Sequence, residues 1–176
     1  HYGEQALQQM MAANQSVADQ KWVEVENYRL QLQQEYEQER GLNALNREGG
    51  LSLADEYNNK LNQFIADQAE SLNNRAQVEM FAHRVGPTQA DFSDGVTKHM
   101  MAESRKFQEE TLKGRMDVTI SGAIVAPTEQ AFATAIARLE GNIGDIAAHE
   151  GWPPEKAQME LRAKVGEVVS QRANRL

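Results

Sequence analysis

The fold is decided by the stretch Thr88–Val125, TQADFSDGVTKHMMAESRKFQEETLKGRMDVTISGAIV, which lies between Pro87 and Pro127 and contains no proline. Its apolar and small residues recur at close to helical spacing. They are Phe92, Val96, Met100, Phe107, Thr111, Gly114, Val118, Gly122 and Val125. As one helix the stretch would be roughly 55 Å long, which exceeds the width of a small domain. We therefore expect an all-α chain that forms an elongated bundle, with partners along this central helix.

The end of the central stretch also has features of a strand. Residues Asp117–Ser121 alternate in polarity and are rich in β-branched side chains. A lone strand would leave its backbone groups unpaired, and the chain offers no second convincing strand. We therefore expect a helix here. If the chain contained a strand, we would expect it at Val118–Val125.

Helical spacing and capping residues predict about six helices, two of them long, in one unit spanning residues 1–176. Ser52 and Thr128 are expected N-caps, and Gly41 and Gly151 are expected C-terminal stops. The last helix should begin at the Trp152-Pro153-Pro154-Glu155 turn, because proline is tolerated in a first turn. The expected helices are Glu4–Arg40, Leu53–Leu72, Val78–Val85, Thr88–Val125, Thr128 to Gly151, and Pro154 to about Arg172, with one extra turn at Leu42–Leu45.

The first helix carries a narrow apolar stripe. Met11, Ala18, Val25 and Leu32 recur in steps of seven, with Leu7, Trp22, Tyr28 and Tyr36 beside them. A seven-residue repeat is typical of coiled coils and long bundles. Two interpretations stay open: the stripe binds another molecule, as in a homo-oligomer, or the central helix of the same chain covers it.

Composition narrows the classes of function. The net charge is −8, from 26 acidic and 18 basic residues, so phosphate-rich partners are repelled. The absence of cysteine excludes disulfides and thiolate metal sites. No apolar run approaches the ~20 residues that span a bilayer. A start at His1 instead of methionine is compatible with a fragment of a longer protein. A weak basic end, which suits a helix dipole better than nucleic acid, comprises Arg162, Lys164, Arg172 and Arg175.

Catalytic chemistry is hard to find in this sequence. His99 and Glu103 lie four residues apart and could share a metal ion only if other helices supplied ligands. A polar helix face, or a hydrogen bond between the two side chains, is the simpler interpretation. His83 and His149 are interpreted as surface residues. Several acidic residues are interpreted as parts of solvated helix faces, namely Glu35, Glu37, Glu39, Glu109 and Glu110. No phosphate-binding loop or nucleophile motif is present. We therefore predict no enzyme, no catalytic, cofactor-binding or metal-binding residue, and no small-molecule substrate.

Glycine and tryptophan are the remaining residues of interest. A glycine inside a helix costs about 1 kcal/mol relative to alanine, so it needs a reason. Gly114 and Gly122 lie on the apolar stripe of the central stretch, which favours close helix packing there. Trp22 and Trp152 could anchor a partner, but a place in the core is favoured. The other glycines expected inside helices are Gly95, Gly144 and Gly166.

Several motifs in the second part of the chain together resemble a known class of protein. They are Arg75-x4-Met80-Phe81, Asp91-Phe92, His99, Glu103, Phe107, Thr111-Leu112-x-Gly114-Arg115-x-Asp117, Phe132-x3-Ile136 and Glu150-Gly151-Trp152-Pro153-Pro154-Glu155. This series, from about Leu53 to Ser170, resembles the large helical internal virion or DNA-ejection proteins of short-tailed phages and prophages.

The resemblance implies a structural role in the virion, after synthesis in the bacterial cytoplasm, and it transfers no active-site residue. Such proteins lie within the capsid or tail, form oligomers and help DNA pass the cell envelope. Two rival hypotheses stay open: a general helical scaffolding or adaptor protein, and an enzyme fragment with a metal at His99 and Glu103.

Overall fold

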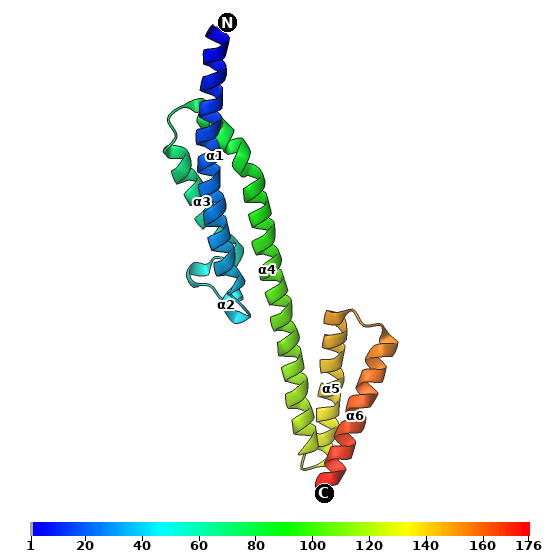
Figure 1. Ribbon diagram of the computed structural model, residues 1–176. Coiled ribbons are helices and arrows are strands. Elements are labelled where there is room, and N and C mark those ends of the chain that lie inside the picture. The colour runs from blue at the N-terminus through cyan, green and yellow to red at the C-terminus, as the bar shows by residue number, and fades with distance from the viewer. Residues whose placement is uncertain (1) are drawn as a thin grey trace. The chain divides into compact units, whose positions relative to one another are not determined.

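The computed structural model describes residues 2–176, which fold entirely into helices and turns (Figure 1). The prediction of an all-α chain with six α-helices, two of them long, is confirmed for these residues. The helices are α1 (Tyr2–Glu37), α2 (Leu42–Leu45), α3 (Leu53–Glu70), α4 (Arg75–Ile124), α5 (Glu129–Glu150) and α6 (Pro154–Arg175), with a short 3₁₀ turn η1 at Glu48–Gly50.

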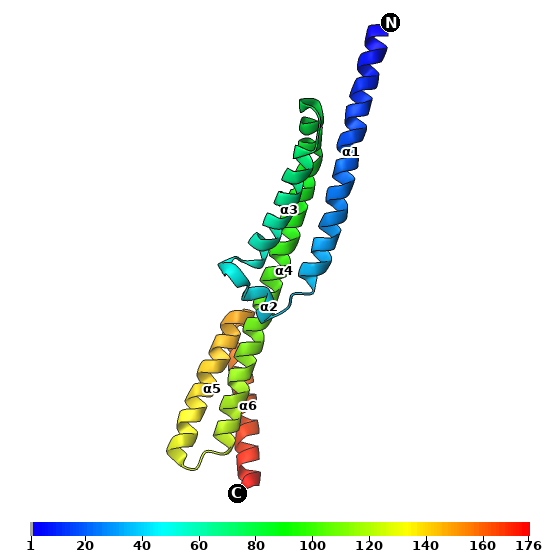
Figure 2. The ribbon, with the colours of Figure 1, turned by 90° about the vertical axis from the view of Figure 1, so that its left-hand side faces the viewer.

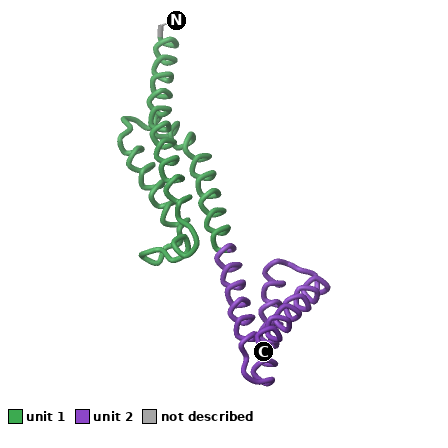
Figure 3. The backbone as a smooth tube through the Cα atoms, turned by 60° about the horizontal axis from the view of Figure 1, so that its bottom comes forward, with its two compact units in different colours: residues 1–104 green, residues 105–176 purple. Residues whose placement is uncertain are grey.

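The chain divides into two compact units, His1–Ser104 and Arg105–Leu176, called unit 1 and unit 2 (Figure 3). Helix α4 contributes its first thirty residues, 75–104, to unit 1 and the rest to unit 2. Each unit has its own apolar core. That the whole chain behaves as a single elongated unit stays a prediction.

Unit 1 packs α1, α3 and the first part of α4 side by side, with α2 below them (Figures 1 and 2). Its core mixes aliphatic and aromatic side chains, and an aromatic cluster lies towards the end of α1. There the Tyr36 ring meets Tyr57 and Phe92 edge-on, at centroid distances of 5.9 and 5.7 Å. The buried core residues are Ala18, Val25, Leu32, Tyr36, Ala44, Leu53, Ala54, Tyr57, Leu61, Ile65, Phe81, Val85, Phe92 and Val96.

Helix α4 continues through Pro87, so the expected break at Gly86-Pro87 is wrong. Proline removes one backbone hydrogen bond and crowds the residue before it. Here the preceding residue is Gly86, whose missing side chain relieves that crowding. Val85 and Thr88, on either side of Pro87, are buried against unit 1. Tertiary packing on both sides of Pro87 therefore stabilises one continuous helix where the sequence suggested two.

The end of α1 also differs from expectation. The helix ends at Glu37, and Gly41 lies in the following turn as the residue before α2, not as the C-cap of α1. The Gln38 and Glu39 N–H groups donate to the carbonyls three residues back, which tightens the last turn. Gly41 still has a positive φ of 57°, so the glycine is needed for the turn although its role was misassigned.

Unit 2 packs the last part of α4 against α5 and α6, with Ala123, Leu139, Ile143 and Val168 fully or almost fully buried. The residues that cap α5 are the ones predicted from the sequence. Thr128 Oγ1 accepts a hydrogen bond from Ala131 N–H, and Gly151 ends α5 in the left-handed conformation. The preference for helix over strand at Asp117–Ser121 is confirmed. In unit 1, Ser52 caps α3 through the Asp55 N–H, also as expected.

Close helix packing occurs at a different glycine from the two that the sequence predicted. A methyl group added at Gly114 or Gly122 would meet no atom within 4 Å, so that prediction is wrong. At Gly95 the added carbon would lie only 2.9 Å from the Tyr36 hydroxyl oxygen. The Tyr36 ring cannot easily withdraw, because it is buried against Tyr57, Phe92 and His99. Gly95 is therefore the glycine that packing requires.

Alanine at these two glycine positions should change stability in opposite directions. Gly95→Ala should lower the free energy of unfolding by about 1–3 kcal/mol, because a close-packed core resists added volume. Gly114→Ala should raise it by up to about 1 kcal/mol through helix propensity alone. Urea unfolding followed by circular dichroism measures both changes. Equal effects of the two substitutions would contradict the packing assigned to Gly95.

Candidate functional site

The first three turns of α1 are left uncovered by the rest of unit 1 (Figure 2). We call residues 3–13 the α1 tip. Its three large apolar side chains are more than half exposed: Leu7 at 58%, Met10 at 63% and Met11 at 54%. Because residues three and four apart share a helix face, these side chains form one patch, called the tip patch.

The point where α1 becomes covered is defined by one polar residue. Asn14 Oδ1 accepts hydrogen bonds of 3.1 Å from both Asn74 Nδ2 and Gln77 Nε2, at the start of α4. Beyond Asn14, helices α3 and α4 accompany α1 to its end (Figure 1). The tip patch therefore ends at Met11, about two helical turns before Ala18, the first buried core residue of α1.

Past Asn14 the stripe predicted from the seven-residue repeat becomes an internal seam. Ala18, Val25 and Leu32 are completely or almost completely buried. The two interpretations of the stripe thus apply to different parts of it. The stripe residues Ala18, Val25 and Leu32 are covered by the same chain, whereas Leu7 and Met11 are open to another molecule.

Polar contacts fix α4 against this seam. Trp22 Nε1 donates to Thr88 Oγ1 at 3.2 Å, and Thr88 Oγ1 donates to Glu26 Oε1 at 2.7 Å. Arg84 lies over the Trp22 ring at 4.3 Å. Burial alone would raise the pKa of Glu26, but hydrogen bonds from Arg29 and Thr88 outweigh it and lower that pKa. Trp22 therefore belongs to the packing of unit 1, as favoured from the sequence.

The α1 tip has almost no charge. Glu4 is its sole charged residue, and the other polar side chains are glutamines. Burying such a surface costs little electrostatic desolvation, because few ions have to leave water. A helix of the same kind can therefore pack against the tip patch, as in a coiled coil.

The candidate metal pair His99 and Glu103 instead holds the turn after α1. His99 Nε2 donates to the Glu39 carbonyl oxygen at 2.8 Å, and Glu103 Oε2 accepts from the Gly41 N–H at 3.0 Å. The His99 ring also lies against Tyr36. Both side chains therefore anchor the chain between α1 and α2, which neither the metal interpretation nor the solvated-face interpretation anticipated.

Glu39 and Arg172, which the sequence placed on an acidic helix face and at a basic helix end, each form an ion pair. Arg47 joins Glu39 and Glu56 at 3.2 and 2.7 Å, so Glu39 belongs to an ion-pair network and not to a plain solvated face. Hydrogen bonding to Glu56 raises the pKa of Arg47. In the basic end of α6, Arg172 pairs with Glu129 at 3.5 Å and lies over Phe132.

Comparison with protein-family models, curated proteins and solved structures finds no match to this chain. Among residues 2–176, no helix is both long enough and apolar enough to cross a membrane. Within this part of the chain, we take the tip patch as the candidate surface for a functional contact. The sequence pattern identified Leu7 and Met11 in it, but not that they alone of the stripe would be uncovered.

Proposed function

We propose that this chain is a non-enzymatic structural segment of a phage virion, of the internal or DNA-ejection type, which acts through protein–protein assembly. The observation that carries the assembly role is the uncovered tip patch of α1. The virion context is supported by the resemblance of the motifs between Leu53 and Ser170 to such proteins.

The assembly partner proposed here is a second copy of this chain. The tip patch continues the seven-residue repeat of the internal seam, in which Met11 stands one repeat before Ala18. Leaving such a patch in water forfeits roughly 25 cal/mol for each Å² of apolar surface. Packing two α1 tips against each other would cover both patches, and the near absence of charge allows either helix direction.

The alternative is a general helical scaffold or adaptor unrelated to virions. It uses the same tip patch, so the patch does not distinguish the two. The anchoring roles of His99 and Glu103 in unit 1 make the enzyme-fragment hypothesis the weakest of the three.

Mass spectrometry of purified phage particles tests the virion proposal. We expect peptides of this chain in particles banded on a density gradient, protected from added protease until the particles are opened. An abundant host cytoplasmic protein is the control for contamination. We also expect the gene to lie among portal, tail and capsid genes. Absence of the chain from intact particles would overturn the virion proposal and leave the scaffold or adaptor as the stronger of the two remaining hypotheses.

A further inference from the structure

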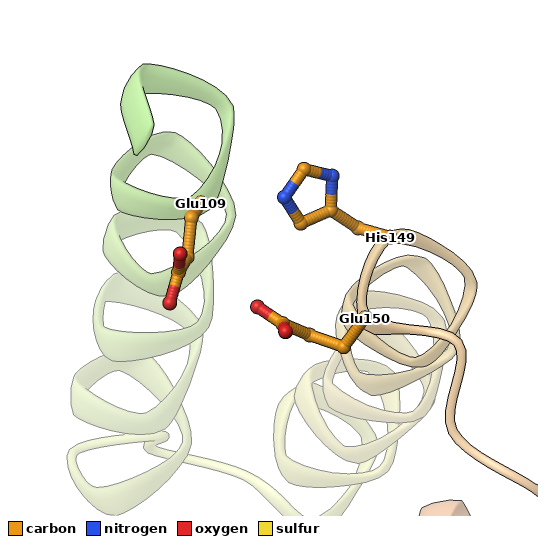
Figure 4. Close-up of side chains that lie close together, drawn as sticks. All are labelled: Glu109, His149 and Glu150. Atoms are coloured by element: carbon orange, nitrogen blue, oxygen red, sulfur yellow. The ribbon is translucent and has the colours of Figure 1, made fainter. Parts of the chain in front are cut away.

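Unit 2 brings three potential metal ligands together from two helices. Glu109 lies on α4, and His149 and Glu150 are the last two residues of α5 (Figure 4). One ligand atom from each lies within 4.8 Å of the others. In Figure 4 the side chains of His149 and Glu150 are directed towards α4, on whose near face the Glu109 side chain lies.

The imidazole of His149 supplies an independent reason to look for a ligand. Its Nε2 atom is buried and has no hydrogen-bonding group of the protein within range. Buried polar atoms almost always have a partner, so an orphan one needs an explanation. In Figure 4 one ring nitrogen of His149 points toward the Glu109 side of the cluster.

The local charges favour a cation between the two carboxylates. Glu109 is already paired with the Lys113 ammonium at 3.0 Å, and this pairing lowers the pKa of Glu109 and raises that of Lys113. The negative end of the α5 dipole also lies at His149 and Glu150. Lys113 is 60% exposed, so it can turn into solvent and release Glu109 to another cation.

We propose that Glu109, His149 and Glu150 bind a divalent transition-metal ion of the Zn²⁺ type. One imidazole with two carboxylates suits zinc, whereas magnesium and calcium prefer oxygen ligands alone. Tetrahedral zinc with bonds of about 2.1 Å needs ligand atoms roughly 3.4 Å apart. The three side chains are all partly exposed, and their ligand atoms have to close from within 4.8 Å by up to about 1.4 Å, which rotamer adjustment allows.

A cavity of about 350 Å³ beside Glu109 and Glu150 leaves room for a water molecule as the fourth ligand. Glu160 and the two basic residues Lys113 and Lys164 also line this cavity. The metal would then join the α4 part of unit 2 to the end of α5.

Titration of the full chain with Zn²⁺ against a chromophoric chelator tests the site, with Mg²⁺ as the control ion. We expect a site that is lost or weakened about 10-fold or more in His149→Ala and in Glu150→Gln. His83→Ala is the matched histidine control, because His83 is exposed on α4 in unit 1, and it should keep the site. Circular dichroism confirms that each variant remains helical.

The substitution Lys113→Gln should change the Zn²⁺ affinity in the opposite direction. Removing the competing ammonium should tighten Zn²⁺ binding, whereas a merely adventitious ion elsewhere would be unaffected. The long-range ¹H–¹⁵N NMR spectrum should show the His149 nitrogens shifting with one equivalent of Zn²⁺. Zinc affinity that is equal in the wild type, His149→Ala and Lys113→Gln would overturn the proposal, as would the absence of binding.

Discussion

Replacing Val25 with aspartate should unfold unit 1. Val25 has no exposed surface and lies in the middle of the seam that α1 forms with the rest of the core. The change buries an unpaired carboxylate and removes an apolar contact, so we expect a loss of about 4 kcal/mol or more. That is comparable to much of the stability of a small domain. Thermal and urea unfolding followed by circular dichroism measures it.

Val23→Asp is the matched control for this substitution. Val23 is on the same helix two residues earlier, but it is 48% exposed. Its replacement should change the free energy of unfolding by about 0.5 kcal/mol or less, apart from helix propensity. If Val25→Asp and Val23→Asp were equally mild, the seam would have to lie between molecules and not within the chain.

The second large effect is expected at the α1 tip. The double substitution Leu7→Asp and Met11→Asp should abolish self-association while leaving the unfolding curve of the chain unchanged. Interface anchors typically contribute about 2 kcal/mol each, so losing even one corresponds to a roughly 30-fold weaker complex. Chemical crosslinking over a range of protein concentrations measures this loss.

Leu30→Asp provides the control for a general effect of charge on α1. Leu30 is 48% exposed but lies far from the tip, beside the covered part of the helix. It should leave crosslinking at the wild-type level. Loss of association in Leu30→Asp but not in the tip variant would place the interface elsewhere on α1.

Local signals predicted three of the helix ends correctly, although Gly41 was misassigned. Ser52, Thr128 and Gly151 act within one helical turn of their own position, so no knowledge of the fold is needed to interpret them. Pro87 failed as a break for the opposite reason. Its cost is local, but Val85 and Thr88 are buried in the core of unit 1, where Trp22 of α1 hydrogen-bonds Thr88.

Periodicity predicted which residues share a face, but not how much of that face is covered. Val118 fits the apolar stripe of the central helix and is 74% exposed. Gly114 and Gly122 were misread for the same reason. The stripe of α1 likewise divides at Asn14, and that boundary depends on where the connection between α3 and α4 ends.

Clusters formed by distant residues could not be found in the sequence. Glu109 and His149 are separated by the end of α4 and almost all of α5, so no spacing rule connects them. His99 and Glu103 show the same limit: their spacing favoured a polar helix face over a shared metal ion, whereas each binds the backbone of a different residue near the end of α1. Such contacts depend on the angle at which helices pack, which short-range patterns do not encode.

The most direct test of the assembly role is sedimentation equilibrium of the wild-type chain and the Leu7→Asp, Met11→Asp variant over a wide range of concentrations. The wild-type chain, 19.7 kDa as a monomer, should reach the mass of a dimer or larger oligomer as its concentration rises. The tip variant should stay at the monomer mass throughout. A wild-type chain that remains monomeric at the highest concentration, or a tip variant that associates as strongly, would contradict self-assembly through α1.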